Sequence, residues 1–296
     1  MTAAPEGEET FELVPLAAGG HSLRSRVNGQ TFHPVVGPMA EARGLHVRGT
    51  RLVERARALA PGEEFVLWDV GLGAAANALA AVAAFDEERL PGMVRLLSFD
   101  RTDAALRFAL ANADALGYPR PHLTDLAREL EEGDLTLRNA AGGTLRWTTR
   151  LEDFPAFLRG ADGADLPAPH AVFYDPYSPT VNPEMWTLEV LSDLRARLRE
   201  NRPCLLTNYT RSTAVRVTLL LAGWYVGIGP STGEKDETTV ATNDPALLER
   251  PLSRDWLEGK VYASTNAAPL RVGGERGPIN PEDFARLQAH GQFAAG

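Results

Sequence analysis

From about residue 64 onward, the sequence alternates apolar runs with segments of helical composition, and this alternation constrains the fold more than any other feature. The runs are apolar nearly throughout, which is typical of strands that are buried on both faces. Strands of this kind with helices between them form a parallel sheet covered on both sides. The expected strands are residues 64–70, 93–100, 170–175 and 203–209, and the expected helices are 74–88, 102–117, 182–201 and 212–223.

Two further β-like stretches, residues 224–229 and 238–243, predict an antiparallel pair that closes the sheet. We therefore expect an α/β fold of the doubly wound, Rossmann-like type, with a mostly parallel sheet and a closing antiparallel strand. Ligands of such sheets bind beyond the carboxyl ends of the strands, so polar residues at those ends are the first candidates for a site.

Two of the expected helices carry boundary signals. Thr102 or Asp103 is the expected N-cap of the second helix, and Gly117 is its expected end. Asn182 followed by Pro183 predicts the start of the third helix, because proline is favoured at the first helical position.

The pattern divides the chain into three parts. Residues 1–62 are an N-terminal extension of short β-like pieces and an arginine-rich helix, and its first 20 residues show no clear element. Residues 63–250 form the core. Residues 251–296 form a tail in which one short helix is expected from Pro281.

The composition excludes several classes of protein. No apolar stretch reaches the ~20 residues that a membrane helix needs. The N-terminus is acidic and lacks the pattern of a signal peptide, so we expect a cytoplasmic protein. The single cysteine, Cys204, excludes an internal disulfide and is expected to be a buried apolar residue. The six histidines show no metal-ligand spacing, so no metal is expected.

The net charge of −9 and the isoelectric point near 5.3 argue against a protein that binds nucleic acid through its overall charge. A local basic patch can exist despite that charge. One segment carries the arginines Arg43, Arg48, Arg51, Arg55 and Arg57. The alternative is that these side chains form a solvated helix face.

A glycine turn follows the first expected strand, in "WDVGLGAAANAL". Gly71 and Gly73 permit a tight turn and a close approach of the backbone to a ligand, and the helix beyond offers free N–H donors. The next strand ends in Asp100, where a carboxylate can accept hydrogen bonds from both hydroxyls of a ribose. Asp69, Gly71, Gly73 and Asp100 are therefore candidate ligands of NAD or S-adenosylmethionine. The alternative for Asp100 is a cap of the following helix.

The third expected strand ends in an aspartate, in "FYDPYSP". A nitrogen nucleophile has to be neutral, with its lone pair directed at the group it attacks. An acceptor at a strand end can hold the N–H protons and orient that lone pair. "DPYSP" is similar to the D-P-P-[YF] signature of amino-group methyltransferases. This favours S-adenosylmethionine over NAD, with Asp175 orienting an amine and Tyr177 packing against a planar substrate. A plain turn of aspartate and prolines is the alternative.

Several blocks in order resemble the methyltransferase domain of the bacterial MnmC family, the enzymes that finish 5-methylaminomethyl-2-thiouridine at the wobble position of tRNA. The resemblance covers roughly residues 20–241. The blocks are "GGHSLRSRVNGQTFHPVVGPMAEARGLHV", "GTRLVER", "VGLGAAANAL", "DPYSPTVNPEMWT" and "GEKDETTVA". The fourth is the most specific, and the third keeps Asn77 beside the two glycines.

The resemblance implies a class I methyltransferase fold with S-adenosylmethionine as the cofactor. The implied acceptor is the exocyclic amine of 5-aminomethyl-2-thiouridine in tRNA. Asp175 would orient this amine, Asp100 would bind the ribose, and Glu41 would contact the methionine moiety. Asn77 is a further candidate cofactor-binding residue, and Asp175 is also a candidate to contact the cofactor.

The resemblance also bears on partners. tRNA is the expected partner, with Arg48, Arg51 and Arg55 as candidate contacts. Larger members of the family carry a second, FAD-dependent domain, whereas nothing after residue 250 has the length or a glycine fingerprint for one. We therefore expect a stand-alone methyltransferase and a separate FAD-dependent enzyme as a candidate partner.

The sequence departs from the family pattern at three places. Ala75 stands where the family has a glycine in its glycine-rich block. Thr149 stands where the family has an acid that meets the adenine amine, and Glu152 or Asp153 is a candidate substitute. Pro176 occupies a position often held by glycine.

These departures leave three other functions open. One is a methyltransferase that acts on a small-molecule or protein amine, which the acidic isoelectric point favours. Another is a degenerate, non-catalytic protein that binds S-adenosylmethionine. The third is an NAD-dependent oxidoreductase, against which the "DPYSPTVNPEMW" block argues.

Overall fold

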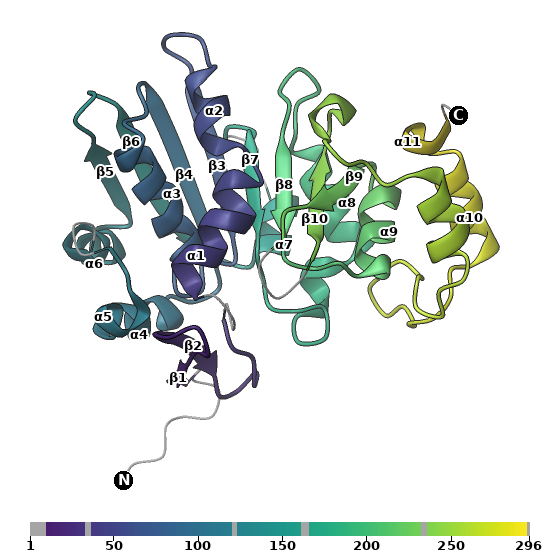
Figure 1. Cartoon of the computed structure of the whole chain (residues 1–296), viewed down its shortest axis with the longest axis horizontal. Helices are drawn as coiled ribbons and strands as arrows, with labels where there is room; N and C mark the ends of the chain where they lie inside the picture. Colours follow the sequence, from purple (N-terminus) through teal and green to yellow (C-terminus); the bar gives the residue numbers. More distant parts are fainter. Residues whose placement is uncertain (1–9, 33–36, 120–122, 161–165, 232–235, 295–296) are drawn as a thin grey trace.

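The computed structural model of the chain describes residues 10–32, 37–119, 123–160, 166–231 and 236–294. Within these ranges, eight strands form one mixed sheet in the order β5-β6-β4-β3-β7-β8-β10-β9 (Figure 1). The strands of this sheet are β3 (Glu64–Val70), β4 (Met93–Asp100), β5 (Asp134–Arg138), β6 (Thr144–Leu151), β7 (Ala171–Tyr174), β8 (Leu205–Asn208), β9 (Tyr225–Gly229) and β10 (Thr238–Thr242).

The sheet is mostly parallel, as the sequence predicted. β6, β4, β3, β7 and β8 run parallel to one another. β10 is antiparallel to both β8 and β9 and lies between them, so the predicted closing pair is confirmed. β5 adds an antiparallel strand at the opposite edge, and neither β5 nor β6 was among the expected strands.

Helices cover both faces of the sheet, because apolar side chains point to both faces, as β3 shows. Phe65 and Leu67 point into one hydrophobic core, and Val66, Trp68 and Val70 point into the other. The helices of the first face are α1 (Pro38–Ala42), η1 (Arg43–Arg48), α2 (Leu52–Arg57), α3 (Ala76–Glu87), α4 (Ala104–Ala111), α5 (Ala113–Leu116) and α6 (Leu123–Glu132). Those of the second are α7 (Phe154–Arg159), α8 (Leu188–Ala196), α9 (Thr213–Leu221), η5 (Trp256–Val261), α10 (Pro281–Gln288) and α11 (Gly291–Ala294). Two short 3₁₀ turns, η3 (Pro183–Trp186) and η4 (Pro245–Leu247), complete the helical elements of the described residues.

Two predicted helix boundaries are wrong. Asn182 and Pro183 begin the single turn η3, and α8 begins only after Thr187, whose side chain accepts a hydrogen bond from the N–H of Val190. Thr187 is extended, with φ −75° and ψ 156°, so it interrupts the helix that the proline signal predicted. The second predicted helix is also broken, at Asn112, into α4 and α5, although it ends at Gly117 as expected.

The N-terminal segment contains an antiparallel hairpin of β1 (Phe11–Pro15) and β2 (His21–Ser25). The expectation that the first 20 residues carry no element is therefore wrong for β1. In Figure 1 the hairpin lies beside α4 and α5, apart from the eight-stranded sheet. Leu23 of the hairpin and Leu52 of α2 belong to the same core as α3, so the described part of residues 1–62 packs as part of the main fold.

The tail covers the edge strand β9. The N–H of Val226 donates to Oε1 of Gln292 over 2.7 Å, and Nε2 of Gln292 donates back to the carbonyl of Val226 over 2.8 Å. The N–H of Ile228 donates to the carbonyl of Arg250. The tail thus pairs with groups that an exposed edge strand would leave open to other chains. Its helix α10 begins at Pro281, as predicted.

Candidate active site

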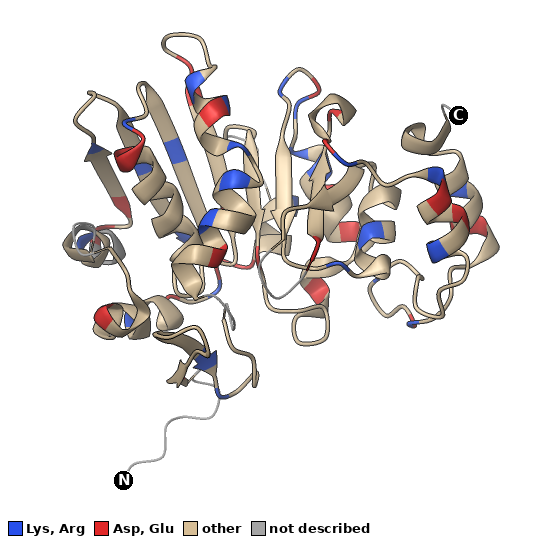
Figure 2. Cartoon of the chain, in the orientation of Figure 1, with Lys and Arg blue, Asp and Glu red and all other residues tan. Residues whose placement is uncertain are grey.

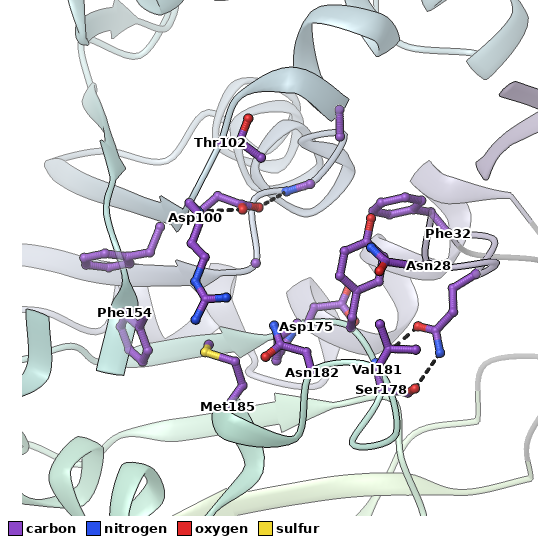
Figure 3. A pocket seen from close by; sticks show the side chains of 18 of the residues that line it. Asn28, Phe32, Asp100, Thr102, Phe154, Asp175, Ser178, Val181, Asn182 and Met185 are labelled. Carbon is purple, nitrogen blue, oxygen red and sulfur yellow. Dashed lines mark hydrogen bonds between the residues drawn. The ribbon is translucent and has the colours of Figure 1, made fainter. Parts of the chain in front are cut away.

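A cavity of about 580 Å³ lies beyond the carboxyl ends of β3, β4, β6 and β7, where the fold predicts a ligand (Figure 3). Seven of the ten residues that the sequence nominated line it: Glu41, Gly71, Gly73, Asp100, Glu152, Asp175 and Tyr177. Asp69, Asn77 and Asp153 do not line it. Its lining is rich in carboxylates, which suits a ligand that carries positive charge.

The glycine turn after β3 packs against the loop that carries Asp175. Gly71 has φ +92°, and a Cβ on it would lie 2.7 Å from the carbonyl oxygen of Asp175. Gly73 has φ +50°, and a Cβ there would lie 2.9 Å from the ring of Phe32. Both glycines are therefore required by the walls of the cavity as well as by the turn itself.

Ala75 keeps the backbone conformation that a glycine would adopt. It lies immediately before α3 with φ +61° and ψ 17°, in the left-handed region that non-glycine residues seldom occupy. The departure from the family pattern therefore adds local strain without opening the turn. The start of α3 still points toward the cavity side of the sheet.

Asp100 ends β4 and faces the glycine turn. Its Oδ2 accepts a hydrogen bond from the N–H of Gly73 over 2.9 Å, and its Oδ1 accepts one from the N–H of Arg101 over 2.7 Å. The N-cap position of α4 is Asp103, and Oγ1 of Thr102 accepts from the N–H of Ala104, so Asp100 does not cap this helix. Asp100 is therefore held at the cavity wall, where a ribose-binding carboxylate is expected (Figure 3).

Asp175 follows β7, and its N–H donates to the carbonyl of Val70 on the neighbouring strand. Its side chain is 14% exposed and lines the cavity. Its Oδ2 accepts a hydrogen bond of 2.7 Å from Nδ2 of Asn77, which is itself buried on α3. The structure therefore places Asn77 behind Asp175, where it holds the carboxylate, and not at the cavity surface.

An aromatic and amide wall faces Asp175 from the N-terminal segment. The ring of Phe32 lies 5.4 Å from that of Tyr177, at an interplanar angle of 60°. The side-chain oxygen of Gln30 accepts from the N–H of Ser178, and Trp186 donates from its indole to the carbonyl of Tyr177. These contacts hold the loop after β7 against the segment that follows the hairpin, and they give the cavity an aromatic wall of two inclined rings.

Gln30, Phe32 and Tyr209 also line the cavity but were not among the candidates from the sequence. Gln30 and Phe32 lie in the N-terminal block of the family resemblance, where Phe32 is the aromatic residue of an aromatic-His pair, but neither was given a role because neither ends a strand. Tyr209 does end a predicted strand, so the rule on carboxyl ends could have found it. Its hydroxyl donates to the carbonyl of Pro176 over 3.1 Å.

The two proposed substitutes for Thr149 differ in position. Glu152 lines the cavity just beyond β6. Asp153 instead caps α7, because its Oδ1 accepts from the N–H of Ala156, and its Oδ2 accepts from the guanidinium of Arg101. Of the two, Glu152 is the acid positioned to meet a ligand.

Asp69 lies within β3 and is fully buried behind the turn. Its Oδ2 accepts from Oγ of Ser98 over 2.8 Å, and its Oδ1 has no hydrogen-bond partner among the described residues. Burial is the main cause that raises the pKa of Asp69 to about 8; the Ser98 hydrogen bond opposes this rise, and the nearby carboxylates of Asp175 and Asp100 add to it. Asp69 is therefore protonated at neutral pH and contributes no negative charge to the cavity.

The arginine cluster lies on the helical segment from η1 to α2, which packs on the first face of the sheet. The guanidinium of Arg55 donates to the carbonyl of Pro203, just before β8, and that of Arg51 donates to the carbonyl of Leu247, beyond the end of β10. Figure 2 shows basic residues along the helical segment from α1 to α2. Arg48 is exposed, whereas Arg51 and Arg55 are partly buried and donate to backbone carbonyls within the chain. The tRNA surface at Arg48, Arg51 and Arg55 stays a prediction.

The sequence also predicted that the chain has no membrane helix and no metal site. Within the described ranges, no helix is long and apolar enough to cross a membrane, and no three histidine, cysteine, aspartate or glutamate side chains gather as metal ligands would. Cys204 is buried, as predicted. Gly233, Glu234 and Lys235 of the last family block lie outside the described residues.

Comparisons with known proteins show the class of protein to which this fold belongs. Residues 140–244 match a family described as S-adenosyl-L-methionine-dependent methyltransferase. The fold resembles the crystal structure of MNMC2 from Aquifex aeolicus, with a TM-score of 0.66 and 24% identity over 96% of this chain and 84% of that one. The chain therefore has the fold and cofactor class of an S-adenosylmethionine-dependent methyltransferase, as the sequence predicted.

Curated relatives give the particular family. The chain is 30% identical over 84% of its length to the "tRNA 5-methylaminomethyl-2-thiouridine biosynthesis bifunctional protein MnmC" of Pseudomonas paraeruginosa. It is 29% identical over 87% of its length to the protein of the same name from Paracidovorax citrulli. The chain belongs to the MnmC family and corresponds to its methyltransferase domain. It spans only 38% and 40% of the length of these two relatives.

Proposed function

We propose that this methyltransferase transfers a methyl group to the exocyclic amine of 5-aminomethyl-2-thiouridine at the wobble position of tRNA. The observation that carries this proposal is Asp175, which Asn77 holds at the wall of an acidic cavity that also has an aromatic wall. A carboxylate there fits a primary amine, and the Phe32–Tyr177 wall fits a flat pyrimidine. Membership of the MnmC family supports the same acceptor.

The residues present also fit the cofactor. Asp100 offers carboxylate oxygens for the ribose hydroxyls, and Glu152 lies near enough to the same wall to meet the adenine amine. Glu41 is the carboxylate on α1 for the methionine moiety. When bound, S-adenosylmethionine supplies an electrophilic methyl group on a positively charged sulfur.

Asp175 acts on the acceptor in this proposal. Its carboxylate accepts the N–H protons of the neutral amine, so that the lone pair points at the methyl carbon. The nitrogen–carbon bond forms as the carbon–sulfur bond breaks, which leaves an ammonium product that then loses a proton. The negative charge of Asp175 also offsets the positive charge that develops on the nitrogen.

The test uses tRNA that carries 5-aminomethyl-2-thiouridine, with isotope-labelled S-adenosylmethionine and mass spectrometry of the digested nucleosides. The label is expected on 5-methylaminomethyl-2-thiouridine. If no nucleoside carries the label and a small-molecule or protein amine does, the tRNA acceptor is wrong and the alternative acceptor is correct. Cofactor binding without transfer to any amine would indicate a non-catalytic family member.

Asp100→Ala is expected to weaken binding of S-adenosylmethionine by about 1–3 kcal/mol, the usual contribution of hydrogen bonds to a charged group. Calorimetry of parent and variant measures the difference, and NAD should give no saturable heat with either. Saturable NAD binding to the parent, or an unchanged affinity for S-adenosylmethionine in the variant, would show that Asp100 is not the ribose ligand of this cofactor.

A further inference from the structure

His46 is a buried titratable residue that the proposed mechanism does not use. It lies on η1, a π-helical turn of the kind that often occurs at functional sites. Its side chain is fully buried, and its ring lies 4.9 Å from the ring of Phe173. The hydroxyl and the N–H of Thr50 both donate to the carbonyl of His46, which fixes the turn.

The two ring nitrogens of His46 have different surroundings. Nδ1 lies 2.8 Å from Oγ1 of Thr207 on β8. Nε2 lies 3.8 Å from Oδ2 of Asp175 and has no hydrogen-bond partner among the described residues. A buried nitrogen without a partner is uncommon in a native interior, and this one faces a candidate catalytic carboxylate. Asn77 approaches the same oxygen, so the two side chains flank Oδ2 from the buried side.

We propose that His46 is a positioning residue, whose Nε2–H joins Asn77 in holding Oδ2 of Asp175 and so turns the carboxylate toward the acceptor amine. This role rests on the proposed function, because it affects turnover only if Asp175 orients an amine. A carboxylate as the neighbour favours the tautomer that carries its proton on Nε2, and the Thr207 hydroxyl then donates to Nδ1. A shift of about 1 Å in the Asp175 side chain brings the pair within hydrogen-bond distance.

A purely structural role would depend on the ring, not on its nitrogens. His46→Phe keeps a ring against Phe173 and removes the N–H, whereas His46→Gln removes the ring and restores a side-chain N–H donor. Phe173→Leu is the matched packing control, because it disturbs the same ring contact without altering a polar group.

The first experiment is a thermal double-mutant cycle, which needs no acceptor. His46→Phe, Asp175→Ala and the double variant are unfolded under the same conditions. If the pair interacts, His46→Phe lowers Tm less in the Asp175→Ala background than in the parent, by about 2–4 °C. Shifts that simply add would overturn the pairing.

The second experiment measures kcat on the tRNA acceptor and the Kd for S-adenosylmethionine. His46→Phe is expected to lower kcat at least about 10-fold with Kd unchanged, and His46→Gln to recover part of that loss. Phe173→Leu should lower Tm and leave kcat near the parent value. Equal kcat in His46→Phe and parent would overturn the positioning role. If the parent itself does not methylate the tRNA, the proposed acceptor fails, while the thermal cycle still decides whether His46 and Asp175 form a pair.

Discussion

Asp175→Asn is expected to lower the rate of methyl transfer by about 10²–10⁴-fold and to leave the affinity for S-adenosylmethionine nearly unchanged. The substitution keeps the size of the side chain but replaces one acceptor oxygen with an N–H donor, which would face the N–H groups of the substrate amine. It also removes the charge that offsets the ammonium product. Single-turnover kinetics and calorimetry measure the two quantities separately.

The pH dependence of turnover sharpens this test. The parent rate should rise with pH until the substrate amine is fully neutral, because only the free base has a lone pair to donate. The Asp175→Asn variant should stay slow at every pH. Asp193→Asn is a matched control, since Asp193 pairs with Arg159 on the surface of α8, and it should behave as the parent does. Normal turnover with lost cofactor binding would instead make Asp175 a cofactor ligand or a turn residue.

The position of Asp175 was predictable because two local patterns agree there. An apolar run predicts a buried parallel strand, and the carboxyl end of such a strand lies at the ligand edge of the sheet. The glycine turn was predictable for the same reason. What the sequence could not show is that Gly71 and Asp175 need each other: the glycine is required because the backbone of Asp175 passes where a Cβ would lie.

No local sequence pattern reveals the residues that contact Asp175 from its buried side. Asn77 was nominated as a cofactor ligand, and only the packing of α3 on β7 shows that it holds Asp175. In the sequence His46 is one of six scattered histidines, and only the structure shows that η1 packs it against β7 and β8. The arginines illustrate the same limit, because a count of charges does not reveal that Arg55 donates to the carbonyl of Pro203, 148 positions away.

Asp69→Asn is expected to stabilise the folded protein at neutral pH, by up to about 4 kcal/mol at pH 7. The unfolded carboxyl ionises near pH 3.8, whereas the buried one has a pKa of about 8. Between these two values the folded state binds one more proton than the unfolded state. The free energy of unfolding of the parent therefore falls as the pH rises through this window, and a neutral amide at this position removes that loss.

The measurement is the free energy of unfolding of parent and variant between pH 4 and pH 8. The gap between them should be smallest near pH 4, widen as the pH rises, and level off above pH 8, with Asp193→Asn following the parent throughout. Parallel curves would mean that Asp69 is ionised in the folded protein.

A neutral Asp69 also has a consequence for the site. A protonated Asp69 adds no negative charge behind the wall that Asp100 and Asp175 line, where the cofactor and the amine are expected.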